Sequence, residues 1–357
     1  MVLDLTLSST ELTRVICDIP SVSGDEAHLA DEIEAAVRAC PHLEVIREGN
    51  TIVARTDLGR AQRVVIAGHI DTVPIHDNLP VREIDVEGLP FLWGRGTVDM
   101  KAGVAVQLKL AAELTSPSVD ITWMWYDNEE VEASKNGLNL LSAQRPELFE
   151  ADFAILGEPS NGAVEGGCNG TLRAVVRTHG VRAHSARAWV GENAIHRAAP
   201  VLARLAEYRA REVAVEGLVY REGLSAVKIS GGVAGNVIPD LCEVEVNYRF
   251  APSKDSAEAE AHVRNVFAGF EVEITDAADG ARPGLDAPIA QQFLSAVGAG
   301  ARPKYGWTDV ARFSALGIPA VNYGPGDPHL AHHDQERVPI EQIEEVERGL
   351  RTWLTAS

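Results

Sequence analysis

The 357-residue sequence is poor in cysteine and in positive charge, and it lacks long apolar runs; each shortage excludes a class of protein. The four cysteines form no C-x-x-C pair, which argues against a disulfide framework or zinc ribbon and predicts reduced thiols in a cytoplasmic protein. A formal net charge of −20 argues against a basic patch that could bind nucleic acid or an anionic membrane. No apolar run could span a bilayer, and no signal-peptide pattern opens the sequence. We therefore expect neither nucleic acid nor membrane as a partner.

The rest of the composition is that of an ordinary globular protein. A hydrophobic fraction of 45% and a charged fraction of 24% are typical values, and this length corresponds to about two domains. Ser9 or Thr10 is predicted to cap a first helix. The following segments predict a second helix, a hairpin that bends at Gly49-Asn50, and a buried strand. This alternation of helices and strands indicates an α/β fold.

The segment Val64–Pro74, VVIAGHIDTVP, contains the first chemically informative residues. Its apolar run, closed by proline, predicts a buried strand, so His69 and Asp71 should project from one face at the strand's end. A histidine placed in this way can bind a metal through one ring nitrogen while the carboxylate accepts the proton of the other. Taken alone, the pattern favours a structural role, in which His69 and Asp71 satisfy each other's hydrogen bonds.

Asp99 lies between a glycine-containing loop and a predicted helix. The loop contains Gly94 and Gly96, but their spacing matches neither G-x-G-x-x-G nor a P-loop, so a phosphate site is rejected. Residues 100–114 have the apolar period of a helix, and Asp99 is explained equally well as the cap of that helix. The local sequence leaves a metal ligand and a helix cap as open alternatives.

Acidic residues also follow two further predicted strands. DITWMWYDNEE ends in Glu129 and Glu130, and Glu158 follows the strand in ADFAILGEPS. Such carboxylates usually belong to solvated turns, but beside a metal one can be a ligand and another a proton acceptor. In open α/β sheets, ligands collect at the carboxyl ends of strands, where clustered carboxylates repel one another without a cation. With His69 and Asp99, these residues favour one metal site over unrelated caps and turns.

The middle of the chain predicts a separate module. Strands there interleave with two helices, of which the first is expected to be long and capped near Asn193. We therefore predict a first domain of residues 1–170 and 284–357, interrupted by an inserted α+β domain of residues 171–283.

Five segments occur in the order of the metal-site motifs of the co-catalytic zinc aminoacylase and carboxypeptidase superfamily, namely HIDTVP, GRGTVDMKAG, DNEE, GEPS and AHHDQERV. The chain resembles this family over nearly its whole length. Two segments of the insertion, RAHSARAWVGENAIH and GGVAGNVIPD, are similar to those of actinobacterial members that hydrolyse N-succinyl-L,L-diaminopimelate. The resemblance implies a zinc-peptidase-like catalytic domain, with a central mixed sheet flanked by helices, and an inserted lid and dimerisation domain.

The resemblance also implies two zinc ions per subunit, for which cobalt or manganese could substitute. The implied metal ligands are His69, Asp99, Glu130, Glu158 and His332. Asp99 is implied to bridge the two ions, Glu129 to act as general base, and Asp71 to orient His69. These roles require the motifs of the family and do not follow from spacing alone.

Two adjacent histidines leave one ligand ambiguous. His332 and His333 both lie in the segment LAHHDQERV. His332 is preferred because the family places its ligand after an alanine and four residues before a glutamate, which Ala331 and Glu336 reproduce.

The inserted domain receives roles from the same resemblance. His184 is implied to reach the active site of the partner subunit in a homodimer. Asn236 and Arg249 match residues that hold the substrate, and an arginine can pair with a succinyl carboxylate through two hydrogen bonds. From the local pattern alone, His184 and Arg249 would be ordinary surface residues.

The implied reaction is the hydrolysis of N-succinyl-L,L-diaminopimelate to succinate and L,L-diaminopimelate, in lysine and diaminopimelate biosynthesis. The alternatives are a related deacylase such as an acetylornithine deacetylase, a dipeptidase, or a non-catalytic relative that binds an acylated amino acid. Glu129 favours an enzyme, because a binding protein has no need of a base. The sequence contains no G-x-S-x-G segment and no cysteine in a nucleophile motif, so a serine or cysteine hydrolase finds no support.

Overall fold

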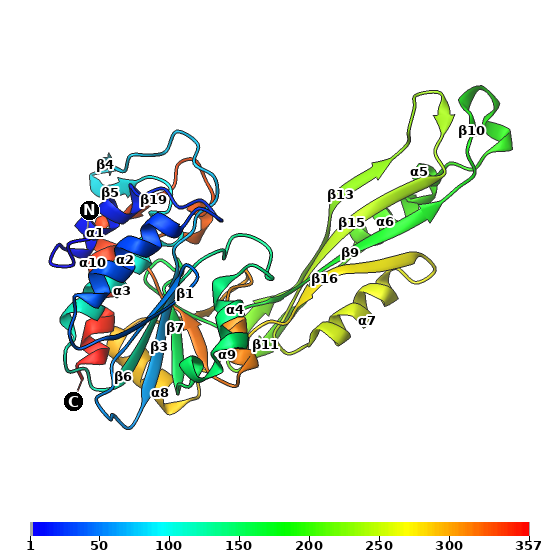
Figure 1. Cartoon of the computed structure of the whole chain (residues 1–357). Coiled ribbons are helices and arrows are strands. Elements are labelled where there is room, and N and C mark those ends of the chain that lie inside the picture. The colour runs from blue at the N-terminus through cyan, green and yellow to red at the C-terminus, as the bar shows by residue number, and fades with distance from the viewer. Residues whose placement is uncertain (1–2, 357) are drawn as a thin grey trace. The chain divides into compact units, whose positions relative to one another are not determined.

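The computed structural model describes residues 3–356, which form two units (Figure 1). Unit 1 comprises the chain up to Gly166, Pro283–Arg302, and the chain from Arg312 onward. Unit 2 comprises Gly167–Arg282 and Pro303–Ala311. The sequence assigned residues 303–311 to the first domain, because so short a segment has no periodicity that would distinguish it. Across the described residues, no helix is both long enough and apolar enough to cross a membrane.

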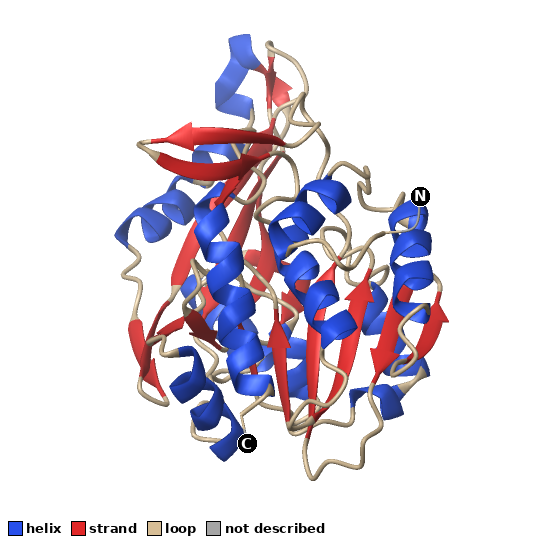
Figure 2. Ribbon diagram, turned by 90° about the vertical axis from the view of Figure 1, so that its left-hand side faces the viewer, coloured by secondary structure: helices blue, strands red, loops and turns tan. Residues whose placement is uncertain are grey.

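Unit 1 is built on a mixed eight-stranded sheet flanked by helices (Figure 2), which confirms the predicted α/β class. In spatial order the strands are β1 (Glu44–Glu48), β2 (Thr51–Arg55), β6 (Asp120–Tyr126), β3 (Arg63–His69), β7 (Phe153–Leu156), β18 (Ala320–Asn322), β8 (Val164–Gly166) and β17 (Ala301–Pro303). β3 pairs in parallel with both β6 and β7, so the carboxyl ends of these three strands lie side by side. The residues predicted at the ends of these strands therefore lie at one edge of the sheet.

The helices of unit 1 come from both ends of the chain. They are α1 (Ser9–Cys17), α2 (Ala27–Arg38), α3 (Lys101–Glu113), α4 (Gly137–Gln144), the 3-10 helix η1 (Pro146–Phe149), α8 (Pro288–Val297), α9 (Val310–Ala315), the 3-10 helix η3 (Pro328–Leu330) and α10 (Ile340–Leu354). The predicted cap of α1 is wrong by one residue. Ser8 is the cap, because its hydroxyl accepts the Glu11 amide while the Glu11 carboxylate accepts the Ser8 amide.

Helix α3 is buried on almost all sides, because it packs against β3 and also contacts α1 and α10. Gly103 permits its close approach to the end of β7. A Cβ atom on Gly103 would lie 2.3 Å from the carbonyl oxygen of Gly157, the residue before Glu158. The small residue therefore determines how near the helix lies to the strand end at which Glu158 is placed.

A three-stranded sheet of order β19-β5-β4 also belongs to unit 1. Its strands are β4 (Arg82–Val86), β5 (Leu89–Trp93) and β19 (Arg337–Pro339). β19 pairs antiparallel with β5, with Arg337 opposite Trp93. This pairing holds the segment after His332 against the strand that leads into the loop of Asp99.

Unit 2 contains an antiparallel four-stranded sheet of order β13-β15-β9-β16. These strands are β13 (Gly223–Gly231), β15 (Leu241–Phe250), β9 (Gly170–His179) and β16 (Glu271–Ala278). The shorter elements are β10 (Ala183–His184), the 3-10 helix η2 (Ser185–Val190), β11 (Glu212–Val215), β12 (Leu218–Arg221) and β14 (Val237–Ile238). The helices that contact the sheet are α5 (Ala194–Arg197), α6 (Ala199–Glu207) and α7 (Ser256–Val266).

Burial alternates along β15, so apolar side chains on one face of this sheet form the core of unit 2 with the helices. The long helix predicted after Asn193 is wrong. Asn193 does cap a helix through the amides of Ile195 and His196, but that helix ends at Arg197 and α6 begins again with Pro200 in its first turn. Proline lacks an amide proton and is favoured at such a new start.

Candidate metal centre

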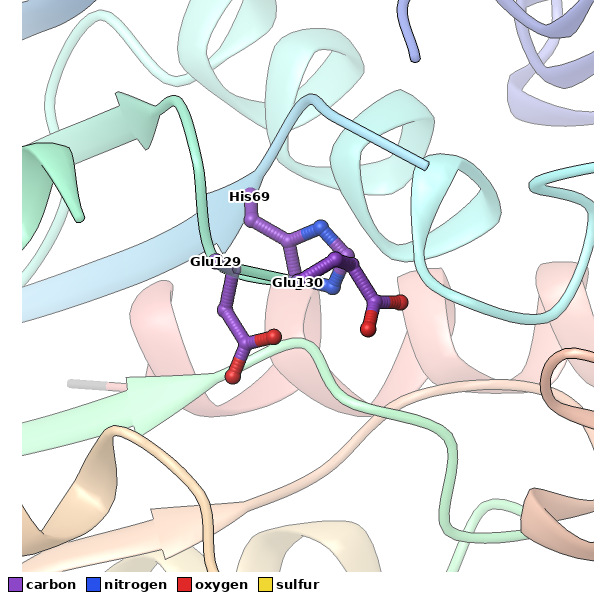
Figure 3. A group of neighbouring side chains, drawn as sticks. All are labelled: His69, Glu129 and Glu130. Carbon is purple, nitrogen blue, oxygen red and sulfur yellow. The ribbon is translucent and has the colours of Figure 1, made fainter. Parts of the chain in front are cut away.

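Three neighbouring strands end in polar side chains at one edge of the central sheet. His69 is the last residue of β3, Glu129 and Glu130 follow β6, and Glu158 follows β7. Figure 3 shows Glu129 and Glu130 beside the ring of His69. One ligand atom from each of these three residues lies within 4.8 Å of the others.

Asp99 lies between two histidines. Its Oδ1 is 3.1 Å from Nε2 of His69, and its Oδ2 is 3.4 Å from Nε2 of His332. The cap of α3 is Met100, and no side chain there bonds the helix amides, so the helix-cap alternative for Asp99 is wrong. Each carboxylate oxygen of Asp99 instead faces a different imidazole.

Two groups of potential metal ligands overlap at this carboxylate. Besides Asp99, which belongs to both, the first group contains His69 and Glu158, and the second contains Glu130 and His332. Imidazole nitrogens and carboxylate oxygens are suitable ligands for divalent metals such as zinc. The donor set therefore fits two ions that share Asp99.

The two adjacent histidines have different surroundings. Nε2 of His332 lies 2.9 Å from Oε1 of Glu130. Nδ1 of His333 instead accepts the amide of Gln335 within its own loop, at 3.0 Å. His332 has a positive φ of 64°, which is uncommon for a residue other than glycine. Only His332 of the pair belongs to a ligand group.

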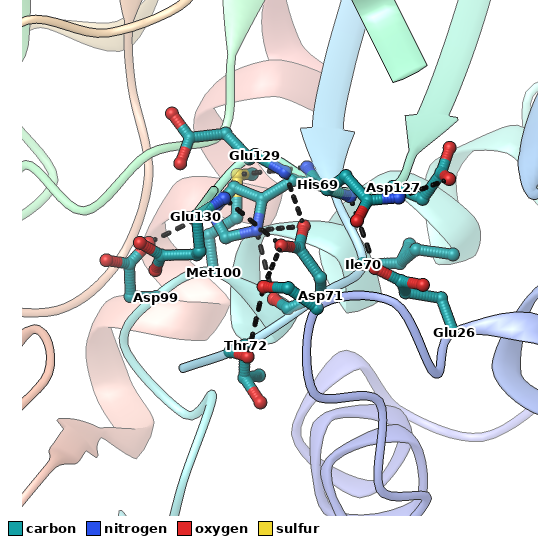
Figure 4. Close-up of polar contacts among 12 residues, drawn as sticks. Glu26, His69, Ile70, Asp71, Thr72, Asp99, Met100, Asp127, Glu129 and Glu130 are labelled. Atoms are coloured by element: carbon teal, nitrogen blue, oxygen red, sulfur yellow. Dashed lines mark hydrogen bonds and ion pairs between the residues drawn. The ribbon is translucent and has the colours of Figure 1, made fainter. Parts of the chain in front are cut away.

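Asp71 is fully buried and has two tasks (Figure 4). Its carboxylate lies 3.4 Å from Nδ1 of His69, whose ring nitrogen is also 3.0 Å from the Asp71 carbonyl. The same carboxylate accepts the backbone amides of Glu129 at 3.0 Å and Glu130 at 3.1 Å, and the hydroxyl of Ser23 at 2.7 Å. The residue predicted to orient His69 therefore also holds the turn of the two glutamates.

Glu26 is a site residue that the sequence analysis did not identify. It is fully buried, and its Oε1 accepts the amides of Gly24 at 2.8 Å and Asn128 at 3.2 Å. Asn128 has a positive φ of 58°, which is uncommon for a residue other than glycine. Glu26 precedes a helix, where a glutamate is ordinary, so its sequence position gives no sign of this role. With Asp71, it binds the amides of three consecutive residues, 128–130.

The protonation of the two histidines fits a site that exchanges protons for metal. Hydrogen bonds to Asp99 and Glu130 raise the pKa of His332 to about 10. Burial opposes charge on His69, but hydrogen bonds to Asp71 and Asp99 still raise its pKa well above the usual value. Burial likewise opposes charge on Asp99, yet the two histidines lower its pKa. Without metal, protonated imidazoles supply the positive charge that a cation supplies when bound.

The predicted residues of unit 2 lie at two ends of its sheet. His184 is exposed in β10 opposite Val237 of β14, and the Ser185 amide donates to the carbonyl of Asn236 at 2.9 Å. Arg249 lies near the far end of β15 and donates to Oδ1 of Asn247 at 3.0 Å. Eight residues of extended strand correspond to roughly 25 Å. Within one chain, the segment of His184 and Asn236 is therefore far from Arg249.

Comparison with known proteins agrees with the fold. Residues 65–356 match the model of peptidase family M20/M25/M40, and the chain belongs to this family. It is a hydrolase of amide bonds that binds divalent metal.

Two relatives are similar over nearly the whole chain. A Mycobacterium tuberculosis protein, named provisionally as a succinyl-diaminopimelate desuccinylase, is 54% identical over 355 residues, which cover 99% of both chains. The succinyl-diaminopimelate desuccinylase of Corynebacterium glutamicum is 48% identical over 364 residues, 99% of this chain and 98% of the relative. Among solved structures, a tripeptidase from Staphylococcus aureus has the same fold, with a TM-score of 0.79, 20% identity and 99% of each chain covered.

Proposed function

We propose that this chain hydrolyses N-succinyl-L,L-diaminopimelate to succinate and L,L-diaminopimelate, as a cytoplasmic step of lysine and diaminopimelate biosynthesis. The names of the two relatives support this substrate. The observation that supports the chemistry is the pair of overlapping ligand groups that share Asp99, with Glu129 beside them.

The proposed cofactor is two zinc ions per subunit, with cobalt or manganese as substitutes. His69 and Glu158 would complete the ligands of one ion, and Glu130 and His332 would complete those of the other. When bound, such ions polarise the amide carbonyl and lower the pKa of water. Asp71 fixes the ring of His69 through Nδ1, which leaves Nε2 toward Asp99.

Glu129 is the proposed general base. A ligand atom of Glu129 belongs to the same close group as His69 and Glu130, so its carboxylate would lie near a water held at the metal centre. The carboxylate accepts a proton from the attacking water and then delivers it to the nitrogen of the leaving amine. The bonds from Asp71 to the turn keep Glu129 in this position.

Arg249 and Asn236 are proposed to bind the substrate, with Arg249 paired to the succinyl carboxylate. His184 is proposed to donate a hydrogen bond to the oxyanion in the partner subunit's site. Asn236 lies in the segment of His184, whereas Arg249 is roughly 25 Å away along β15, so one small substrate cannot contact both ends of the sheet of a single subunit. A second subunit would supply the residues that the first cannot.

Unit 2 also has the surface expected of a lid domain that forms a homodimer. β13 lies at one edge of its sheet and exposes Val227 and Ile229, and Trp189 of η2 is 80% exposed. Exposed edge strands with apolar side chains pair readily with another strand. We propose that a second copy of this chain covers this edge.

The substrate proposal is tested by succinate release from N-succinyl-L,L-diaminopimelate by zinc-loaded protein. N-acetylornithine and a series of dipeptides serve as competing substrates under the same conditions. Selective release of succinate is expected. Turnover of only another substrate would retain the metal chemistry and contradict the succinyl substrate, whereas no turnover with both metals bound would favour a binding protein.

A further inference from the structure

The loop of Asp99 and the loop of His332 meet at one buried carboxylate, that of Glu336. Glu336 is only 1% exposed. Its Oε1 accepts the backbone amides of Val98 at 2.9 Å and Asp99 at 3.1 Å. Because Glu336 follows His332 by four residues, one side chain connects the shared ligand with the segment of a second ligand.

The other oxygen of Glu336 is paired with Arg95. Oε2 lies 2.8 Å from Nη1 of Arg95, and both side chains are buried. Nε of Arg95 donates to the carbonyl of Pro74 at 3.1 Å, in the segment that follows His69. The amide of Gly94 also donates to the carbonyl of Glu336 at 3.0 Å. The ion pair therefore joins the three segments that contain His69, Asp99 and His332.

Stability alone is a poor explanation for this ion pair. A buried ion pair is often no more stabilising than an apolar pair of the same size, because the cost of removing two charges from water offsets their attraction. The bonds of Glu336 are directed at the backbone of Asp99 itself, on which both ligand groups depend.

We propose that Glu336, held in place by Arg95, is a positioning residue that sets Asp99 relative to His332 so that both metal sites form together. Resting on the metal centre of the proposed function, this inference adds a determinant of metal affinity outside the ligand set. Neither residue of the pair belongs to a group of potential metal ligands among the described residues.

The test compares wild type with Glu336→Gln and Arg95→Gln. Zinc affinity of the metal-free proteins is measured by competition with a chromophoric chelator, and the visible spectrum of each cobalt-loaded protein is recorded. Each single change leaves one buried charge unpaired next to the Asp99 loop. We expect zinc to bind roughly 10- to 100-fold more weakly, with altered cobalt bands.

The double variant Arg95→Gln, Glu336→Gln leaves no unpaired charge, so it is expected to bind zinc more tightly than either single variant. It also serves if a single variant does not fold, and it should then bind zinc about tenfold more weakly than wild type. Glu222→Gln is the matched control, because Glu222 is another buried glutamate, paired with Arg211 at 2.9 Å in unit 2.

The outcomes separate this inference from the proposed function. If wild type binds two ions while the pair variants keep its zinc affinity and cobalt spectrum, the positioning role is overturned, even if they melt earlier. A loss of affinity equal to that of Glu222→Gln would overturn it as well. Failure of wild type to bind two ions would overturn the metal centre and this inference with it.

Discussion

Glu129 and Glu130 are neighbours in the sequence, yet the turn after β6 gives them different surroundings. Oε1 of Glu130 lies 2.9 Å from Nε2 of His332. Glu130 belongs both to the ligand group that contains His69 and Glu129 and to the group that contains Asp99 and His332, whereas Glu129 belongs only to the first of these. Both amides are bound by Asp71, so the direction of each side chain is determined by the backbone of the turn. Adjacent carboxylates can therefore act as base and ligand.

Replacing the proposed base should separate catalysis from metal binding. In Glu129→Gln, the metals should remain while kcat falls roughly 10²- to 10⁴-fold, because the amide cannot accept the proton of water. Turnover and bound zinc are measured on the same preparation. Glu130→Gln is the control and should lose zinc affinity instead. Near-normal turnover of Glu129→Gln would show that the base is another residue.

Metal binding should release protons, since the pKa of His332 is raised to about 10 and that of His69 is also raised. Both rings are thus expected to hold a proton to higher pH than a free imidazole does, and each should lose it when a cation binds Nε2. Zinc affinity should therefore rise with pH and fall as the solution is acidified. Calorimetry in buffers of different ionisation enthalpy should give about two protons released per chain.

The adjacent histidines provide the control for this experiment. His332→Gln should lower the number of protons released by about one, whereas His333→Gln should leave it unchanged, because His333 belongs to no ligand group among the described residues. Zinc binding without proton release by wild type would mean that the rings are neutral before the metal arrives.

At the scale of elements, the parallel strands β6, β3 and β7 bring the ligands together, and the segments after them determine their geometry. The turn after β6 contains Asn128 with positive φ and is held by two carboxylates, those of Glu26 and Asp71. The loop before α3 is held by Glu336. Both of these ligand segments thus have a buried acceptor from elsewhere in the chain.

Glu26→Ala tests the support of this turn. Two backbone amides, those of Gly24 and Asn128, would lose their acceptor, the buried Glu26 carboxylate, at a cost of about 1–3 kcal/mol in the free energy of unfolding. We also expect kcat to fall roughly 10- to 100-fold, because Glu129 moves with the turn. Glu26→Gln keeps the acceptor oxygen and should retain most activity. Equal kcat values for the two variants would contradict the positioning role.

At the scale of the whole molecule, the two units contain different kinds of residues. Unit 1 contains all three groups of potential metal ligands found among the described residues, whereas unit 2 contains an exposed apolar edge strand and the residues proposed to bind substrate. His184 and Arg249 lie near opposite ends of the sheet of unit 2. The dimer proposed above would resolve this separation, since each site would use His184 of the partner subunit.

Mixed dimers test whether each site is shared. His184→Ala and Glu129→Gln subunits are expected to be almost inactive separately. A heterodimer of the two would contain one intact site, so an equal mixture with random pairing should recover about a quarter of wild-type activity. Activity is measured after the subunits have been mixed and allowed to exchange. If exchange is demonstrated and activity does not recover, the site is complete within one chain.

Several features could be predicted because their signal is local. His69, Glu129, Glu130 and Glu158 each follow a recognisable strand, and parallel strands necessarily end at one edge. The errors were also local. Ser8 caps α1 in place of the predicted Ser9 or Thr10, and a new helix begins at Ala199, with Pro200 in its first turn, where the pattern predicted one long helix.

The sequence by itself determined the α/β class and which residue types stand at the ends of its strands, because hydrophobic period and strand boundaries are properties of neighbouring residues. Only the tertiary structure decided what those residues face. Arg95 meets Glu336 across 241 positions, and Glu26 meets Asn128 across 102. Hydrogen bonds between such distant positions arise from packing of the whole chain, so no periodicity in the sequence predicts them.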